Sequence, residues 1–134
     1  MNIIKEVKKL KFPRGEYVVV GIGILSVLNL RKAKDIDIAV TAPLLKKLRA
    51  SGRWKEVIRY NKVFLERKKV DIITRLNWNK YSTTTAKAIK TAVIIDGVYF
   101  LNIRETIKFK TALGRAKDFR DIKLLKKYLL KNKK

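Results

Sequence analysis

Two aspartates, Asp35 and Asp37, flank a single isoleucine at the start of an apolar segment. The apolar residues that follow predict a strand, and side chains alternate between the two faces of a strand. Both carboxylates therefore lie on one face, about 7 Å apart along the chain, while Ile36, Ile38 and Val40 point into a core. Two carboxylates placed in this way can hold a hard cation. The alternative is a surface pair that neighbouring lysines neutralise.

A third acid, Asp71, stands between Val70 and Ile72 on another predicted strand, where an apolar residue would be expected. Its carboxylate could complete a three-acid cation site, with Asp37 as its nearest companion. The alternative is a salt bridge on an edge strand, because lysines are plentiful. Asp35, Asp37 and Asp71 are therefore the candidate catalytic and metal-binding residues.

Two segments could bind phosphate. Gly21 and Gly23 enclose Ile22 in a turn before a short predicted helix, and backbone N–H groups at such a place favour an anion. The alternative is a plain strand-to-helix turn. Arg115 and Lys117 stand at the start of the last predicted helix and could meet a polyphosphate. Their acidic neighbours, Asp118 and Asp121, fit helix capping and local salt bridges better.

Hydrophobic periodicity and turn residues give the elements that must position these side chains. Strands are predicted at 17–20, 35–41, 57–60, 63–66, 70–74, 92–95 and 98–101. Helices are predicted at 1–11, 24–30, 43–50, from within 82–85 to about 90, 103–113 and 116–130. In the last helix an apolar stripe is predicted, formed by Phe119, Ile122, Leu125 and Leu129. The sequence thus predicts one α/β (α+β) domain over residues 1–134, with a helical C-terminal part.

The composition limits the chemistry. The chain has no cysteine and no histidine, which excludes a Ser-His-Asp triad, a histidine general base and zinc held by histidine or thiolate. Any metal must have oxygen ligands, which favours magnesium or manganese. No apolar run reaches the length of a membrane span and no signal-peptide pattern opens the chain, so we expect a cytoplasmic protein without a membrane partner.

The charge is extreme, with 34 Lys and Arg against 11 Asp and Glu, a net charge of +23. An excess of this size indicates an anionic partner, most often RNA or DNA. The alternative is a lysine-rich proteome, which would spread lysines over every solvated face.

Taken together, these features resemble the polymerase-beta-like nucleotidyltransferase superfamily in its small, minimal form. That family shows an apolar strand, a Gly-Ser or Gly-Gly turn, a short helix, an Asp-x-Asp strand and a later strand with a third acid. The matching positions here are 18–20, 21–23, 24–30, Asp35 with Asp37, and Asp71. The segment from Gly97 to Ile122 is similar to the end of many such domains, so the resemblance covers about residues 16–130.

The resemblance implies a nucleotidyltransferase-like mixed sheet and transfer of a nucleoside monophosphate from a nucleoside triphosphate (NTP) to a hydroxyl. Asp35, Asp37 and Asp71 would hold magnesium, and Asp71 would help to deprotonate the acceptor. Gly21, Gly23, Arg115 and Lys117 would bind the nucleotide.

One position departs from the family. Ile22 takes the place of a serine that usually hydrogen-bonds a phosphate, although backbone N–H groups could still do part of this work. The alternative function is therefore a catalytically inactive protein of this fold that binds nucleic acid through its basic surface. The acceptor and the need for a partner protein stay open.

Overall fold

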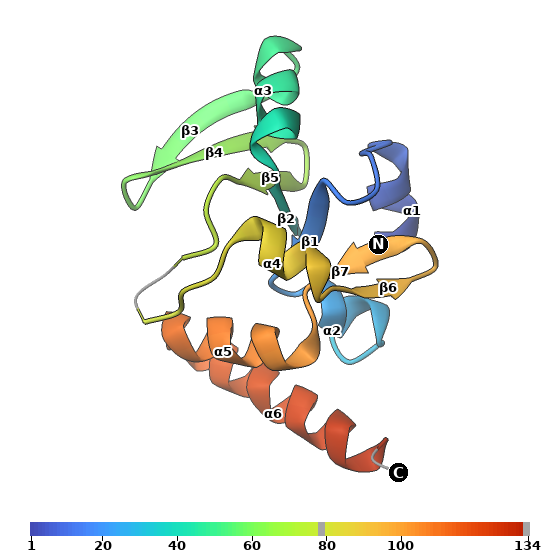
Figure 1. The fold of residues 1–134 in the computed structure, drawn as a ribbon. Coiled ribbons are helices and arrows are strands. Elements are labelled where there is room, and N and C mark those ends of the chain that lie inside the picture. Colours follow the sequence, from blue (N-terminus) through green and yellow to red (C-terminus); the bar gives the residue numbers. More distant parts are fainter. Residues whose placement is uncertain (78–79, 133–134) are drawn as a thin grey trace.

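A seven-stranded mixed sheet forms the centre of the protein (Figure 1). The computed structural model describes residues 1–77 and 80–132. The strands in that part are β1 (Tyr17–Val20), β2 (Ile36–Val40), β3 (Lys55–Arg59), β4 (Lys62–Arg67), β5 (Val70–Ile73), β6 (Val93–Ile95) and β7 (Val98–Phe100). The helices are α1 (Ile3–Lys9), α2 (Gly23–Val27), α3 (Ala42–Ala50), α4 (Thr85–Lys90), α5 (Ile103–Leu113) and α6 (Ala116–Lys131). The predicted mixture of helices and strands is confirmed, as is the helical C-terminal part.

The strand order is β3-β4-β5-β2-β1-β7-β6, so β2 and β1 lie in the middle. β1 is antiparallel to β2 and parallel to β7, whereas β2 is parallel to β5. The hairpin of β3 and β4 therefore stands between β2 and β5 in sequence but on the outer side of β5 in space (Figure 1).

Both faces of the central strands are buried. On one face Val19, Ile36 and Ile38 pack in a cluster with Ile3 of α1 and Leu25 of α2. On the other face a smaller cluster includes Val18, Val20, Ala39, Ile73 and Ala88 of α4. Because side chains alternate along a strand, Asp37 shares the face of Ala39, and Asp71 shares the face of Ile73. The two aspartates therefore belong to the α4 face of the sheet.

Several loops depend on small or polar residues in the left-handed region. The predicted hairpin turn between β6 and β7 has Asp96 at φ 53° and Gly97 at φ 81°, as the favoured two-residue turn requires. The helix α2 ends at Val27, earlier than predicted, because Asn29 at φ 59° turns the chain toward β2. The strand β2 begins at Ile36, so Asp35 lies directly before it.

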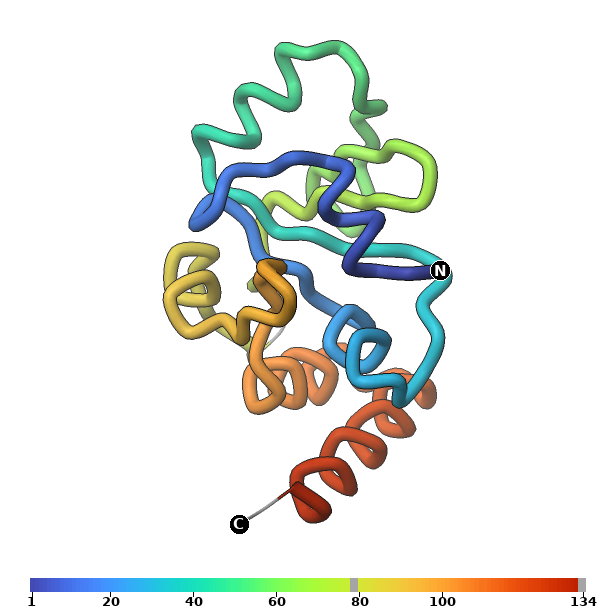
Figure 2. The backbone as a smooth tube through the Cα atoms, turned by 90° about the vertical axis from the view of Figure 1, so that its right-hand side faces the viewer, coloured from blue at the N-terminus to red at the C-terminus, as the bar shows by residue number. Residues whose placement is uncertain are grey.

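The predicted apolar stripe of α6 is only half right. Ile122 and Leu125 are buried, but Phe119 is 53% exposed and Leu129 is 39% exposed. The helix packs against α5, and its C-terminal turns extend past the rest of the protein (Figures 1 and 2). The burial of α6 is therefore confined to part of the predicted stripe.

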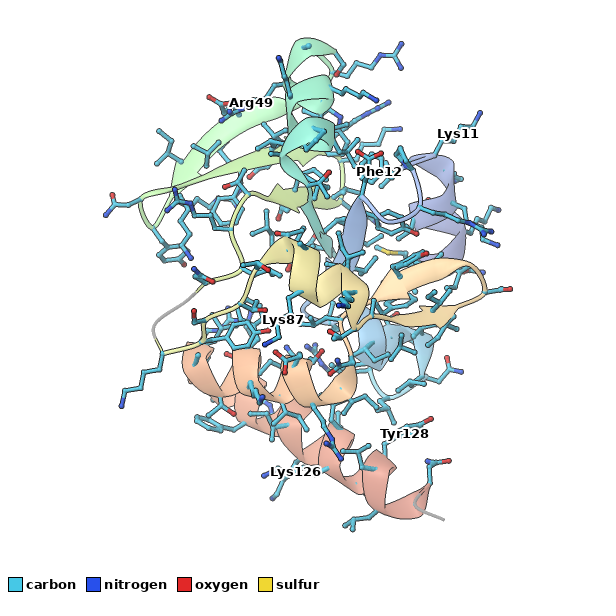
Figure 3. All side chains as sticks on the ribbon, in the orientation of Figure 1. Lys11, Phe12, Arg49, Lys87, Lys126 and Tyr128 are labelled. Atoms are coloured by element: carbon cyan, nitrogen blue, oxygen red, sulfur yellow. The ribbon has the colours of Figure 1, made fainter. Side chains whose placement is uncertain are left out.

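At the opposite end, Phe12 joins the loop after α1 to the sheet (Figure 3). Its ring packs against Tyr17 at 6.0 Å and Trp54 at 6.4 Å between centroids. Among the described helices, none combines the length and the apolar character that crossing a membrane requires.

Candidate functional site

The three aspartates come together at the N-terminal end of β2. Asp37 and Asp71 are register partners on the parallel strands β2 and β5, and Asp35 lies two residues before Asp37. The pKa of Asp37 is raised from the usual 3.8 to about 6, first by burial and then by the negative charges of Asp71 and Asp35, against the opposing charges of Lys110 and Arg115. The register places the carboxylates of Asp37 and Asp71 side by side on one face of the sheet.

Asp71 is not on an edge strand, contrary to the alternative interpretation, because β5 lies between β4 and β2. Arg59 Nη1 lies 3.9 Å from Asp71 Oδ2, which is a long ion pair, and Arg59 also pairs with Glu66. Burial raises the pKa of Asp71, Arg59 lowers it and Asp35 raises it, and the net direction is upward. The nearby arginine therefore leaves part of the charge of Asp71 uncompensated.

The chemistry of this donor set fits a hard divalent cation, because it consists of carboxylate oxygens alone and their mutual repulsion would be relieved by positive charge. The carboxylates do not form a closed cage, however: within residues 1–77 and 80–132 no group of three or more acids is arranged to hold a metal ion. Metal binding by Asp35, Asp37 and Asp71 therefore stays a prediction.

A cavity of about 670 Å³ opens beside Asp35 and Asp37. This volume falls in the range of about 300–1,000 Å³ that is typical of small-molecule sites. The glycine turn contributes Gly21 and Ile22 to its lining. Basic side chains in the lining include Arg31, Lys32, Lys34, Lys110, Arg115 and Lys117. Aromatic and aliphatic side chains in the lining are Tyr60, Phe64, Ile73, Leu76, Phe109 and Leu113.

The lining thus combines the acidic Asp35 and Asp37, called the acidic corner below, with the basic side chains, called the basic wall, and the aromatic and aliphatic side chains, called the apolar wall. Arg115 and Lys117, which the sequence suggested as phosphate ligands, lie in the basic wall. Asp71 lies beside Asp37 on the neighbouring strand but is not one of the residues that line the cavity. An anionic group with an apolar appendage matches this division of charges.

The two glycines of the turn have different roles. Gly21 has φ 64°, and a Cβ there would lie 3.1 Å from Asp37 Oδ2, so the missing side chain lets the backbone approach the carboxylate. Gly23 is buried in the first turn of α2, and a Cβ there would lie 2.4 Å from Val19 Cγ1. Gly21 is therefore positioned to affect the site, whereas the absence of a side chain at Gly23 serves packing of α2 on β1.

Gly21→Ala is expected to impair the site more than the fold. A non-glycine residue in the left-handed region costs about 1–2 kcal/mol, and here the methyl group would also push against the carboxylate of Asp37. Thermal unfolding and ligand binding at the cavity should be measured together with Gly52→Ala as control. Gly52 has φ 69° and no atom within 4 Å of its Cβ position, so it carries the backbone cost alone. Equal binding by the two variants would contradict a role for Gly21 beside Asp37.

A buried ionic cluster supports the basic wall. The side chain of Lys110 is 5% exposed, and its Nζ lies 2.9 Å from Asp121 Oδ2 and 3.6 Å from Asp118 Oδ1. Arg31 donates two hydrogen bonds to Asp121, at 2.6 and 2.8 Å. Arg115 donates to the carboxylate of Asp118 from its backbone N–H and from its side chain, so Asp118 caps the start of α6.

The predicted capping role of Asp118 is confirmed, but the predicted local pairing of Asp121 is wrong. Asp121 binds Arg31, which is 90 residues away in sequence, because α6 packs beside the turn that follows α2. Burial raises the pKa of Asp121, yet the hydrogen bonds from Arg31 and Lys110 outweigh it and hold the pKa below its usual range. The cluster fixes α5 and α6 beside the entry to β2.

Lys110 and Arg31 are the site residues that sequence reasoning missed. One signal existed for their partners: Asp118 and Asp121 stand four residues before Ile122 and Leu125, on the buried stripe of α6. Acids on a buried stripe require buried cations, but the sequence does not reveal which of its many basic residues they are.

Comparison with known proteins adds no relative, since no family model, no curated protein and no solved structure matches this chain.

Proposed function

We propose that the protein is a metal-dependent nucleotidyltransferase that moves a nucleoside monophosphate from an NTP to a hydroxyl. The observation that carries this proposal is the register of Asp37 with Asp71, with Asp35 nearby, beside a cavity that has a basic wall. Phosphoryl chemistry requires cations around the phosphates and a base near the attacking hydroxyl. The cations that line the cavity and the aspartates beside it could supply both.

In this proposal the exposed cations of the basic wall bind the triphosphate, chiefly Arg115 and Lys117. Asp35, Asp37 and Asp71 would hold magnesium, which would supply positive charge to offset the negative charge of the phosphates. Asp71 accepts the proton of the acceptor hydroxyl, and its raised pKa suits a group that must take up a proton. The hydroxyl oxygen forms a bond to the α-phosphorus as the bond to pyrophosphate breaks, and pyrophosphate leaves.

The apolar wall provides a place for the nucleobase. Phe109 packs against Tyr81, with 5.4 Å between ring centroids, and Arg59 lies over the ring of Phe64 at 5.7 Å. Both rings are thus fixed by neighbours before any ligand binds. A flat base stacks favourably on such surfaces without a demand for one base identity.

The test is incubation with each α-labelled NTP and magnesium, with RNA, DNA and protein as acceptors. Wild type should transfer label, and Asp35→Asn/Asp37→Asn should not. Asp96→Asn is the matched control, because Asp96 is an exposed aspartate in the β6–β7 turn and should leave transfer unchanged. Absence of transfer by the wild type with every acceptor would overturn the catalytic proposal.

The basic surface and Ile22 favour one second candidate, a protein that binds nucleic acid without turnover. Ile22 lines the cavity and is the N-cap of α2, yet it makes no side-chain capping hydrogen bond. Salt-sensitive binding of RNA or DNA that persists in Asp35→Asn/Asp37→Asn, with no transfer by wild type, would support this candidate.

Ile22→Ser is expected to tighten NTP binding if the proposal is right. The new hydroxyl could donate a hydrogen bond to a phosphate, and hydrogen bonds to charged groups contribute about 1.5–3 kcal/mol, so KM for the NTP should fall about tenfold. Steady-state kinetics measure this effect, with Ile22→Val as control for lost apolar volume. An unchanged KM in both variants would show that this turn does not meet the phosphates.

A further inference from the structure

A second hollow, of about 600 Å³, adjoins the cavity at the start of α6. The two share Arg31, Lys117 and Asp121 in their linings. The rest of the second hollow is lined by α6 alone, through Arg120, Lys123, Leu124 and Lys127. A continuous surface therefore leads from the acidic corner outward along the last helix.

The basic residues of this surface lie on one side of α6. At 100° per residue, Lys117, Arg120, Lys123 and Lys127 fall within a sector of about 120°. We call these four residues the basic face of α6, and all four are exposed. From the first to the last they span about 15 Å, which equals about three to four phosphates of a nucleic-acid strand.

The charge of this surface is mainly positive. Asp121 is the acid in the lining of the second hollow, and it is already bound to Arg31 and Lys110 within the protein. The basic face therefore presents cations without a matching row of acids in the same lining. A row of evenly spaced cations matches a row of phosphates, which is a feature of polynucleotides and not of small hydroxyl compounds.

We propose that the acceptor is the end of a single-stranded polynucleotide whose phosphates lie along the basic face of α6. This inference rests on the proposed function, since it names the molecule whose hydroxyl is modified. The last nucleotide enters the cavity beside Asp35 and Asp37, and the preceding phosphates follow Lys117, Arg120, Lys123 and Lys127 outward along α6. The strand is single in this proposal because an unpaired last nucleotide can leave its neighbours and enter the cavity without the cost of opening a base pair.

The test compares two sets of substitutions that remove the same charges. Arg120→Gln/Lys123→Gln/Lys127→Gln removes most of the basic face and spares Lys117, which lines the catalytic cavity. The control, Lys46→Gln/Lys47→Gln/Arg53→Gln, removes one arginine and two lysines that are exposed on α3 and just after it. Figure 3 labels Arg49 on the same helix, at the end of the protein opposite to α6.

Binding is measured by fluorescence anisotropy with labelled 20-nucleotide RNA and DNA single strands and their duplexes, over a range of salt. The α6 variant should bind single strands about 10- to 100-fold more weakly, and its slope of log K against log salt should fall by about 2. The control should keep the slope of the wild type. Equal weakening by both variants would overturn the proposal, as would a preference for duplexes.

Transfer assays separate this inference from the proposed function. If it is right, the α6 variant raises KM for the strand and leaves KM for the NTP unchanged. Transfer to a strand at an unchanged KM would overturn the inference and leave the nucleotidyltransferase proposal standing. If the wild type shows no transfer, the proposed function is overturned. The acceptor role is then overturned with it, even if the α6 variant binds the strand more weakly than the wild type.

Discussion

Asp37→Asn is expected to abolish nucleotidyl transfer and to make the metal-free protein more stable at pH 8. The loss of activity follows from the proposed role of this carboxylate: charge stabilisation by a bound metal is worth several kcal/mol, about 1,000-fold in rate. The gain in stability follows from the pKa of Asp37, which burial and the charges of Asp71 and Asp35 raise to about 6. Because ionisation of Asp37 destabilises the folded state at pH 8, replacing its carboxylate with a neutral amide raises the free energy of unfolding at that pH.

The free energy of unfolding of the wild type depends on pH through Asp37. Between pH 4 and pH 6 the unfolded chain releases the proton of Asp37 while the folded protein retains it, so the free energy of unfolding falls as pH rises. Above pH 6 this loss is complete and amounts to about 1–3 kcal/mol for a half-buried group. The Asn variant should therefore match wild type near pH 4 and exceed it at pH 8.

Urea unfolding of both proteins in EDTA, from pH 4 to pH 8, measures this difference. Asp96→Asn serves as control, because Asp96 is exposed in a turn and its variant should follow wild type at every pH. Magnesium with NTP should stabilise wild type more than Asp37→Asn. An Asn variant less stable than wild type at pH 8 would mean that Asp37 is compensated by a partner in the fold, and the cation-site interpretation would then lose its physical basis.

Lys110→Met is expected to destabilise the protein strongly, by about 3–5 kcal/mol. Lys110 is buried between Asp118 and Asp121, and the variant would leave two buried carboxylates with one cation fewer. For a chain of this length we expect a fall in Tm of about 10–20 °C. The same variant removes a positive charge that lowers the pKa of Asp37, so transfer should fall even where the variant is folded.

Two variants make this result specific. Lys108→Met removes an exposed lysine on the same helix that pairs with Glu105, and it should cost less than about 1 kcal/mol. Lys110→Met/Asp121→Asn removes both charges of one pair and should recover part of the lost stability. A double variant no more stable than Lys110→Met would show that lost packing, rather than an uncompensated charge, is the cause. Scanning calorimetry at pH 7 gives all three values.

Much of the fold could be predicted from the sequence, because its elements are short and bounded by clear turn residues. Asp96-Gly97 predicted a hairpin turn, and Asn102 predicted the start of α5, where its side chain accepts a hydrogen bond from the N–H of Glu105. The alternation of Asp35 and Asp37 with isoleucines predicted a common face for the two acids, and Ile36 and Ile38 are buried accordingly.

The sequence could not show how distant elements meet. The register of Asp37 with Asp71 depends on β5 returning parallel to β2 after a helix and a hairpin, which no local pattern encodes. The same holds for Arg31 with Asp121, and for Lys110, whose burial depends on the packing of α5 against α6. In a chain with 34 basic residues, burial of one lysine leaves no compositional signal.

The parallel pairing of β1 with β7 has a consequence for the order in which the protein is assembled during synthesis. Val19 meets Phe100 only after about eighty further residues have been made, so one edge of the apolar strand β1 waits unpaired while the ribosome continues. A nascent chain that ends before α5 already carries Asp35, Asp37 and Asp71 but lacks Lys110, Arg115 and Lys117. The three aspartates are thus synthesised before Lys110 and Arg115, whose charges lower the pKa of Asp37, so the C-terminal helices complete the site as well as the fold.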